Sequence, residues 1–408
     1  MQRRLPFDDV AWEQSDNVYF EWRTKLLKPE TLTEIALFVA KYHLGTPVEV
    51  RAPLTGAYNV AVVIDFSDGG STLIRFPKPG KVMFPEEKVR NEVAVMRDAL
   101  NTPGIPYEER PILDPSIDGE KPRGLYGQVA DVLLQLSMLS FLKIGSLAQV
   151  DDGDTWSVTE RPLSSNMNEI VQLGTLPRSK LPDKSATFET SSSYLTTLAN
   201  LHLRHLTHQR NDAIDSAKRL SPQIYCKIPF PEALSREQTI APRSQFRAFQ
   251  TLSPSYSAPV EFSHAPPWWL LIEQPEYWPR GIDKWITAYE PRLQTILAVL
   301  REREDALIQE DRLGEQQRLS LPMRESWDCG DFWLVYAARK GFTFNAAFWK
   351  YLDARFFGPV AGLDGDEWER RAGLLDEEEI MEIDSFVEQK VEELKTRVLA
   401  WKPEEQLG

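Results

Sequence analysis

The pattern of apolar and polar positions predicts a β-hairpin in the first quarter of the chain. Apolar residues dominate residues 60–66, and residues 72–76 return as a second strand that carries Arg75. Between the two strands, Asp68 and Gly69 are expected to supply the positive φ angles of a tight turn. Residues 51–76 are therefore predicted to form the hairpin.

Helical periodicity dominates the rest of the sequence. Pro29 opens the first predicted helix, because proline is well placed at the first helical position. Apolar stripes at helical spacing predict further helices at residues 86–100, 125–143, 191–210, 283–310, 323–357 and 375–401. Together with the hairpin, this pattern indicates an α+β fold.

The middle of the chain contains its longest apolar stretch, residues 129–150. Asp131, Gln135 and Lys143 interrupt this stretch, which predicts an amphipathic core helix that is too polar to span a membrane. The following residues, 144–190, are polar and are predicted to be irregular, with Trp156 and the step from Arg161 to Leu163 as anchors.

Length and composition place the chain among globular proteins. It has 408 residues, of which 42% are hydrophobic, enough for two or three domains or lobes. A formal charge of −14 argues against nucleic acid or an anionic membrane as the main partner. The two cysteines, Cys226 and Cys329, are too few for a disulfide framework or a zinc site. With no apolar secretory segment at the N-terminus, a cytoplasmic location is expected.

Residues 219–255 differ in composition from the rest of the chain. They contain prolines at 222, 229, 231, 242 and 254, and they lack Gly, Asp, Asn and His altogether. Their charged residues are net basic within an acidic chain.

Several stretches, in their order along the chain, resemble one known family. They are APLTGAYNVAVVIDFSDGGSTLIRFPKPG, EEKVRNEVAVM, YGQVADVLLQLSMLSFLKIGSL, SVTERPLSSNMNE, LHLRHLTHQRND, APVEFSHAPPWWLL and MRESWDCGDFW. The chain in these stretches resembles the fungal branch of the aminoglycoside phosphotransferase family, choline-kinase-like small-molecule kinases that share the protein-kinase-like two-lobe fold.

The resemblance implies a division of the chain into lobes. A helical extension would cover residues 1–44, a truncated small β lobe residues 45–100, and a mainly helical large lobe residues 101–402. Residues 219–255 would be an atypical insert within the large lobe, and residues 403–408 a tail.

The resemblance also implies ATP and Mg²⁺ as cofactors and a small molecule with a hydroxyl group as substrate. The loop from Gly56 to Asn59 would cover the phosphates. Arg75 would take the place of the strand lysine that pairs the α- and β-phosphates, and Glu92 would orient it. The predicted nucleotide-binding residues are therefore Gly56, Asn59, Arg75 and Glu92.

Two segments that the family's mechanism needs are missing from the sequence. In the family, a catalytic loop and a metal-binding Asp occupy the interval that here is residues 219–255, which has no Asp or Asn. The hinge that pairs the adenine would lie between Arg97 and Asp98. We therefore predict no catalytic residue and no metal ligand, and expect weak nucleotide binding without phosphoryl transfer.

Three hypotheses follow from this pattern. The full-length product of the gene is an active small-molecule kinase, and the two gaps are skipped coding segments. Alternatively, the chain is a pseudokinase that acts as a binding or scaffold module. The third hypothesis is an incomplete product that does not fold uniquely, because a sheet of two or three strands has little core.

Each residue singled out for a function also has a purely structural interpretation. Gly56 and Asn59 are equally compatible with a plain strand-to-strand loop, and Arg75 with a surface ion pair. His202, His205 and His208 recur every three residues, which turns about 300° per step on a helix and favours a packing or solvated row over a metal site. Trp268 and Trp269 are expected to pack in the core.

Overall fold

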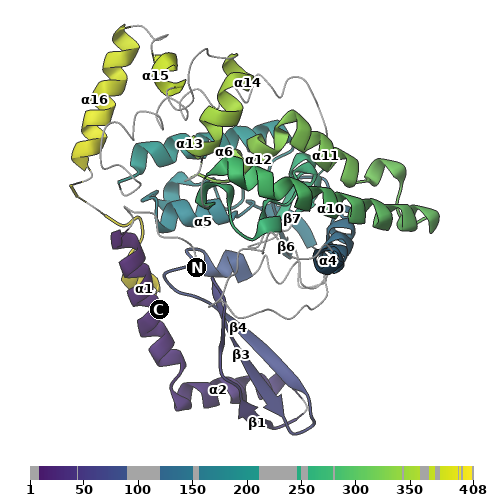
Figure 1. Cartoon of the computed structure of the whole chain (residues 1–408). Helices are drawn as coiled ribbons and strands as arrows, with labels where there is room; N and C mark the ends of the chain where they lie inside the picture. The colour runs from purple at the N-terminus through teal and green to yellow at the C-terminus, as the bar shows by residue number, and fades with distance from the viewer. Residues whose placement is uncertain are drawn as a thin grey trace.

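The computed structural model describes residues 9–43, 45–89, 120–149, 156–210, 246–249, 256–278, 281–341, 344–358, 367–372, 377–393, 395–396 and 398–406. These residues form an α+β structure in which a small antiparallel sheet lies at one end of a larger helical body (Figure 1). The predicted fold class, α+β, is confirmed at this level.

The sheet is built around strand β3, Asn59–Phe66, which pairs with every other strand of the sheet. Its neighbours are β1 (Pro47–Val50), β2 (Leu54–Thr55) and β4 (Ser71–Pro77), all antiparallel to it. Every second residue of β3 is buried, because successive side chains of a strand point to opposite faces of the sheet. The predicted hairpin is therefore confirmed.

The hairpin turn differs from the prediction in one respect. Only Gly69 has a positive φ, at 85°, and Asp68 does not. The Asp68 carboxylate instead accepts a hydrogen bond from the Gly70 N–H at 3.0 Å, and the Phe66 N–H donates to the Gly70 carbonyl at 2.9 Å. The side chain of Asp68 thus closes the turn, so a single left-handed residue is enough.

Two N-terminal helices pack against the sheet. Helix α2, Pro29–Val39, begins at the predicted proline and contributes Ala36 and Val39 to a core with Val62, Ile64 and Phe66. Helix α1, Asp9–Leu26, runs between the helical body and the sheet (Figure 1). Near its start Trp12 packs with Leu173 of the body, and further along Tyr19 packs with Val60 of β3.

The helical body surrounds one extensive core. Its longer helices are α4 (Glu120–Ser137), α5 (Ser165–Gln172), α6 (Ser191–His208), α10 (Ile282–Gln309), α11 (Ser320–Cys329), α12 (Asp331–Ala338) and α16 (Glu377–Glu393). Shorter helices are α9 (Val260–His264), α13 (Phe344–Ala347), α14 (Asp353–Phe357) and α15 (Glu367–Ala372). Aromatic rings fill the centre, where Trp285 stacks on Tyr289 with ring centroids 4.2 Å apart.

The predicted core helix over residues 129–150 is wrong in its second half. Helix α4 ends at Ser137, and the chain continues as β5 (Ser140–Phe141) and β6 (Ser146–Gln149). The partners of these strands are β8 (Phe246–Phe249), which also pairs with β9 (Tyr256–Pro259), and β7 (Trp156–Glu160).

The prediction of an irregular stretch at residues 144–190 is also wrong, because β7 and α5 lie within it. Gly145 shows why strands form here. A side chain at Gly145 would lie 2.5 Å from the Glu160 carbonyl oxygen, and its N–H donates to the Ser257 carbonyl at 3.0 Å. These contacts join residues that are distant in sequence, which local periodicity does not detect.

The predicted helix at residues 323–357 is divided into shorter ones. Gly330, with φ of 85°, ends α11 and precedes α12, because a left-handed residue cannot continue a helix. The last predicted helix is confirmed but shorter, and its Val387 packs against Leu206 of α6.

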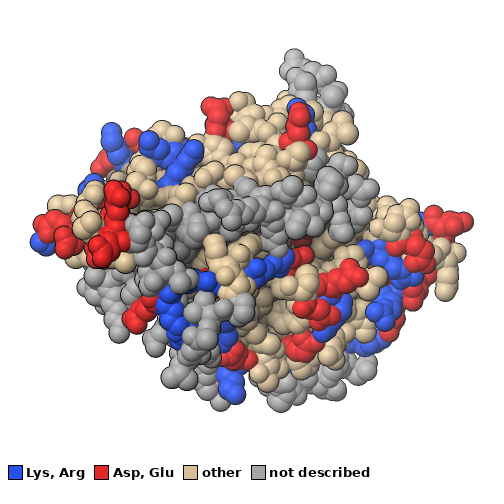
Figure 2. Space-filling model, turned by 90° about the horizontal axis from the view of Figure 1, so that it is seen from above, with Lys and Arg blue, Asp and Glu red and all other residues tan. Residues whose placement is uncertain are grey.

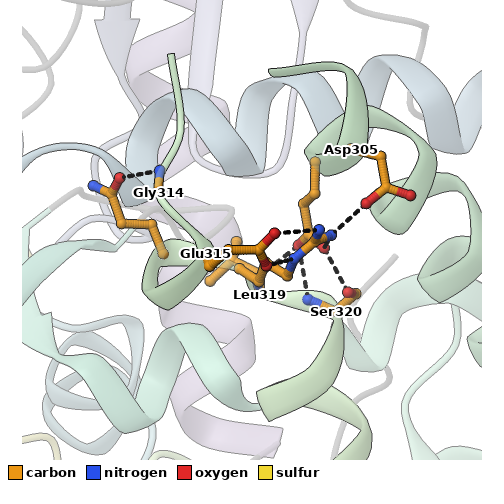
Figure 3. A network of polar contacts seen from close by, with 8 residues as sticks. Asp305, Gly314, Glu315, Leu319 and Ser320 are labelled. Atoms are coloured by element: carbon orange, nitrogen blue, oxygen red, sulfur yellow. Dashed lines mark hydrogen bonds and ion pairs between the residues drawn. The ribbon is translucent and has the colours of Figure 1, made fainter. Parts of the chain in front are cut away.

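A buried carboxylate fixes the start of α11 against the long helix α10 (Figure 3). Glu304 of α10 is fully buried and accepts hydrogen bonds from the N–H groups of Leu319 and Ser320 at 2.7 and 2.9 Å. The Ser320 hydroxyl donates to the same carboxylate at 2.5 Å, and Arg318 pairs with it at 3.5 Å. Glu304 therefore caps the helix from another element.

We expect Glu304→Ala to lower the free energy of unfolding by about 3 kcal/mol, because it leaves buried donors without an acceptor. Urea denaturation measures this loss. The matched control is Asp305→Ala, which removes one of the two exposed partners of Arg318 and should cost less than about 1 kcal/mol. Equal losses in the two variants would contradict the capping role.

Candidate functional site

The predicted glycine loop connects β2 to β3 as a tight turn. The Gly56 N–H donates to the Asn59 carbonyl at 2.9 Å, which closes the turn on itself. A side chain at Gly56 would make only ordinary contact, 3.6 Å from the same carbonyl oxygen. Neither backbone geometry nor packing therefore requires glycine at this position.

Asn59 and Arg75, two of the predicted site residues, lie side by side at the base of this loop. In the amide orientation that satisfies all neighbours, the Asn59 side-chain oxygen accepts a hydrogen bond from an Arg75 Nη atom at 2.8 Å. The same oxygen accepts from the Lys88 Nζ atom at 3.2 Å, and the amide nitrogen donates to the Tyr58 carbonyl at 3.2 Å. The structure thus brings two cations to a single neutral oxygen.

Lys88 is the site residue that the sequence analysis missed. It lies in the helical segment at residues 85–89 and is only 4% exposed. Glu92, the fourth predicted residue, lies outside the described residues, so its pairing with Arg75 stays a prediction. Lys88 precedes Glu92 by four positions, and residues four apart share one face of a helix. That spacing is the signal that could have identified Lys88.

A groove lies between the loop and the start of α5. It is lined by Tyr58, Val82, Phe84, Lys88, Leu163, Ser164, Ser165 and Asn168. The enclosed part of this groove measures about 10 Å³, close to the space that one water molecule needs. As it stands, the groove is too small to hold the base and sugar of a nucleotide.

Segment 78–88, which follows β4, is docked on α5 by side chains of that helix. Asn168 accepts from the Met83 N–H at 2.7 Å and donates to the Lys81 carbonyl at 2.9 Å. Gln172 donates to the Gly80 carbonyl at 3.0 Å. Gly80 is required here, because its φ is 74° and a side chain would lie 2.6 Å from the Ser15 carbonyl oxygen of α1.

A buried ion pair adds to this docking. Arg161, predicted as an anchor, bonds Glu87 through two nitrogens, at 2.8 and 3.0 Å, and also donates to the Pro182 carbonyl at 2.7 Å. The side chains of Arg161 and Glu87 are 7% and 14% exposed. The role of Arg161 as an anchor is confirmed, and its partner comes from the helix that carries Lys88.

Lys78 lies at the beginning of the docked segment, and its N–H donates to the Tyr58 carbonyl at 2.9 Å. Its ammonium lies over the Tyr19 ring, 4.4 Å from the centroid. Burial, and then repulsion from Lys81 and Arg23, lowers the pKa of Lys78 to about 8.

The histidine row and the tryptophan pair have structural surroundings. His202 and His205 are buried within α6, and a ring nitrogen of His202 lies 3.2 Å from the Ala338 carbonyl oxygen. The packing alternative therefore holds for these two histidines. Trp268 and Trp269 pack on the main core, as expected. Among the residues that the structure describes, no group of three or more His, Cys, Asp or Glu side chains is arranged to hold a metal ion.

The charge distribution on the surface and the composition of the helices relate to two predicted absences, of nucleic acid and of a membrane as partner. On the face shown in Figure 2, acidic and basic side chains are interspersed over the described residues. A nucleic-acid-binding face would instead concentrate basic residues. None of the described helices combines the length and apolar composition that crossing a membrane requires.

Comparison with known proteins identifies no relative, because no family model, curated protein or solved structure matches the chain. The chain is therefore classified by its own structure as an α+β protein with small antiparallel sheets.

We expect Arg161→Met to lower the free energy of unfolding by about 3 kcal/mol, because it leaves Glu87 partly buried without a partner. The double variant Arg161→Met/Glu87→Met should regain most of this loss in urea denaturation. The control is Arg51→Met, which breaks an exposed pair with Asp65 on the sheet and should change stability little. A double variant no more stable than the single one would count against the ion pair.

Lys78 should make stability rise with pH. Its folded pKa of about 8 lies below the unfolded value of 10.5, so between these values the unfolded chain binds more protons than the folded protein. Lys78→Met should therefore be more stable than the wild type at pH 7, and this advantage should shrink as the pH rises towards 10.5. Urea denaturation at several pH values measures it, with the exposed Lys25→Met as control. An advantage independent of pH would refute the assignment.

Proposed function

We propose that the chain is an aminoglycoside phosphotransferase-like protein that has kept a site for phosphate groups and lacks phosphoryl transfer. The observation that carries the proposal is the meeting of Asn59, Arg75 and Lys88 beside the Gly56 turn. Arginine and lysine together are the side chains that proteins use most for phosphate oxygens.

The absence of transfer is supported by the sequence and by the groove. Phosphoryl transfer needs a carboxylate to accept the substrate proton and further groups to hold Mg²⁺. Among the residues that the structure describes, the lining of the groove includes no carboxylate. The interval where the family has its catalytic loop, residues 219–255, contains no Asp or Asn.

The scaffold hypothesis has an observation of its own. Apolar side chains are exposed on α2 and near it, where Leu37, Phe38 and Tyr42 are 60%, 51% and 80% exposed. The rings of Phe38 and Tyr42 lie 5.6 Å apart and form a small apolar surface. Larger apolar surfaces of this kind mark contacts with other proteins, and this small one is compatible with a phosphate site elsewhere on the same chain.

The proposal predicts that ATP stabilises the protein weakly and that Mg²⁺ does not strengthen this effect. Arg75→Met should weaken ATP binding about tenfold to a hundredfold, since it removes a charge-assisted hydrogen bond worth about 1.5–3 kcal/mol. Calorimetric titration and thermal denaturation measure this, with Arg51→Met as the matched control.

A coupled assay for ADP release, run with a panel of small hydroxyl compounds, should show no turnover. Magnesium-dependent turnover above the rate without enzyme would overturn the proposal. Transcript sequencing across codons 97–98 and 219–255 tests the skipped-segment hypothesis separately. A longer message that encodes both missing segments would assign the activity to that longer product.

A further inference from the structure

Residues 398–406 lie at the junction where α1, segment 78–88 and α5 meet. Their short helix η7, Pro403–Gln406, lies against α1 (Figure 1). We propose that residues 398–406 form a releasable strap, which holds α1 and residues 78–84 on the helical body when it is bound and loosens them when it detaches. The strap goes beyond the proposed function, because it concerns how the two parts of the molecule are held together.

Trp401 is the main anchor of the strap. It is 4% exposed and belongs to the main core, and its indole nitrogen donates to the Gln172 carbonyl at 3.1 Å. The side chain of Gln172 in turn donates to the Gly80 carbonyl at 3.0 Å and to the Ser15 hydroxyl of α1 at 3.2 Å. Trp401 is therefore bonded to the residue that joins α1 and segment 78–88 to the body.

Leu399 extends this contact towards the start of α1. It packs with Ala11, Trp12 and Leu173, the cluster that connects α1 with the body, and it also lies against the main core. Burial of its apolar side chain stabilises the contact of α1 with the body, because the apolar surfaces of all these residues are removed from water together. The strap therefore reinforces both connections between the sheet and the helical body.

Gln406 holds the docked segment from the other end of the strap. In the amide orientation that satisfies both neighbours, its side-chain nitrogen donates to the Val82 carbonyl at 3.2 Å, and its oxygen accepts from an Arg178 Nη atom at 2.9 Å. The Arg178 guanidinium lies over the Phe84 ring, 5.4 Å from the centroid. The strap thus reaches Val82 directly and Phe84 through Arg178. Because Val82 and Phe84 line the groove, the strap also supports one of its walls.

The strap is suited to release because exposed chain precedes it and side chains hold it. Lys395, Thr396 and Val398, which follow α16, are exposed. The backbone hydrogen bond of Glu405 stays within the strap, from its N–H to the Lys402 carbonyl at 3.2 Å. Segments with few buried contacts open at a lower free energy than the core around them. We therefore expect the strap to open while α5 and α10 stay folded.

Hydrogen exchange of the full-length protein, followed by mass spectrometry, tests this device. In the wild type, the amides of residues 398–406 should exchange faster than those of α10. Trp401→Ala removes the buried anchor, so it should speed exchange of residues 78–84 at least about tenfold and leave α10 unchanged. The matched control is Glu404→Ala, which changes an exposed residue of the same strap and should affect neither region.

A peptide added in trans separates release of the strap from general damage to the core. A peptide of residues 398–408 should restore slow exchange of residues 78–84 in the full-length Trp401→Ala variant. The same peptide carrying Trp401→Ala should not restore it. Gln406→Ala is a milder second variant, and it should speed exchange of residues 78–84 about threefold, because it removes the bond to the Val82 carbonyl without opening a cavity.

Several results would overturn the inference. Exchange of residues 78–84 that is unchanged in both Trp401→Ala and Gln406→Ala would show that the strap holds nothing. Unfolding of Trp401→Ala, equally faster exchange in α10, or strap amides as slow as those of α10 would make residues 398–406 a fixed part of the core. A wild-type peptide that fails to restore slow exchange would show that the strap has no separable binding site.

Discussion

The docking of residues 78–88 on α5 is the interaction on which the rest of the structure depends. Asn168 and Gln172 bond the backbone of this segment, so their contacts fix its course whatever side chains it carries. The buried pair of Arg161 and Glu87 then fixes the start of the next helical segment. Because each partner would be left as an unpaired buried charge, the pair resists separation of the two parts. The sheet, the Gly56 turn and Lys88 therefore hold a defined position relative to the helical body.

The small sheet needs this support because its own core is limited. Val62, Ile64 and Phe66 pack with two residues of α2, which is a small core for a sheet with open edges. Helix α1 provides a second connection, since Trp12 packs on the body and Tyr19 packs on the sheet. The two N-terminal helices thus act as structural parts of the sheet layer. The Gly56 turn, the docked segment and the start of α5 together form the groove.

The sequence predicts those parts of the fold whose signals are local. The apolar run that becomes β3 and the proline that opens α2 each act within a few residues, and both predictions are confirmed. The helix predicted beyond Ser137 is wrong because the contacts that form strands there are not local. Gly145 lies against Glu160 and its N–H donates to Ser257, both distant in the sequence. The site shows the same division. Asn59 and Arg75, which the sequence predicts together, lie on one hairpin. Lys88 comes close to Asn59 in a segment that is docked on α5, and local sequence patterns do not show that docking.

The proposed function, a phosphate site without phosphoryl transfer, follows the same division along the chain. The residues around the groove come from the hairpin, the docked segment and the start of α5, all before residue 170. Residues 219–255, where the resemblance places the carboxylates of a transferase, follow all of these residues in the sequence and contain no Asp or Asn. Cationic side chains hold a phosphate group when they lie close to it. Transfer of a phosphoryl group also requires an aligned base and metal ligands. Loss of one later segment can therefore remove the chemistry and leave the electrostatics of binding intact.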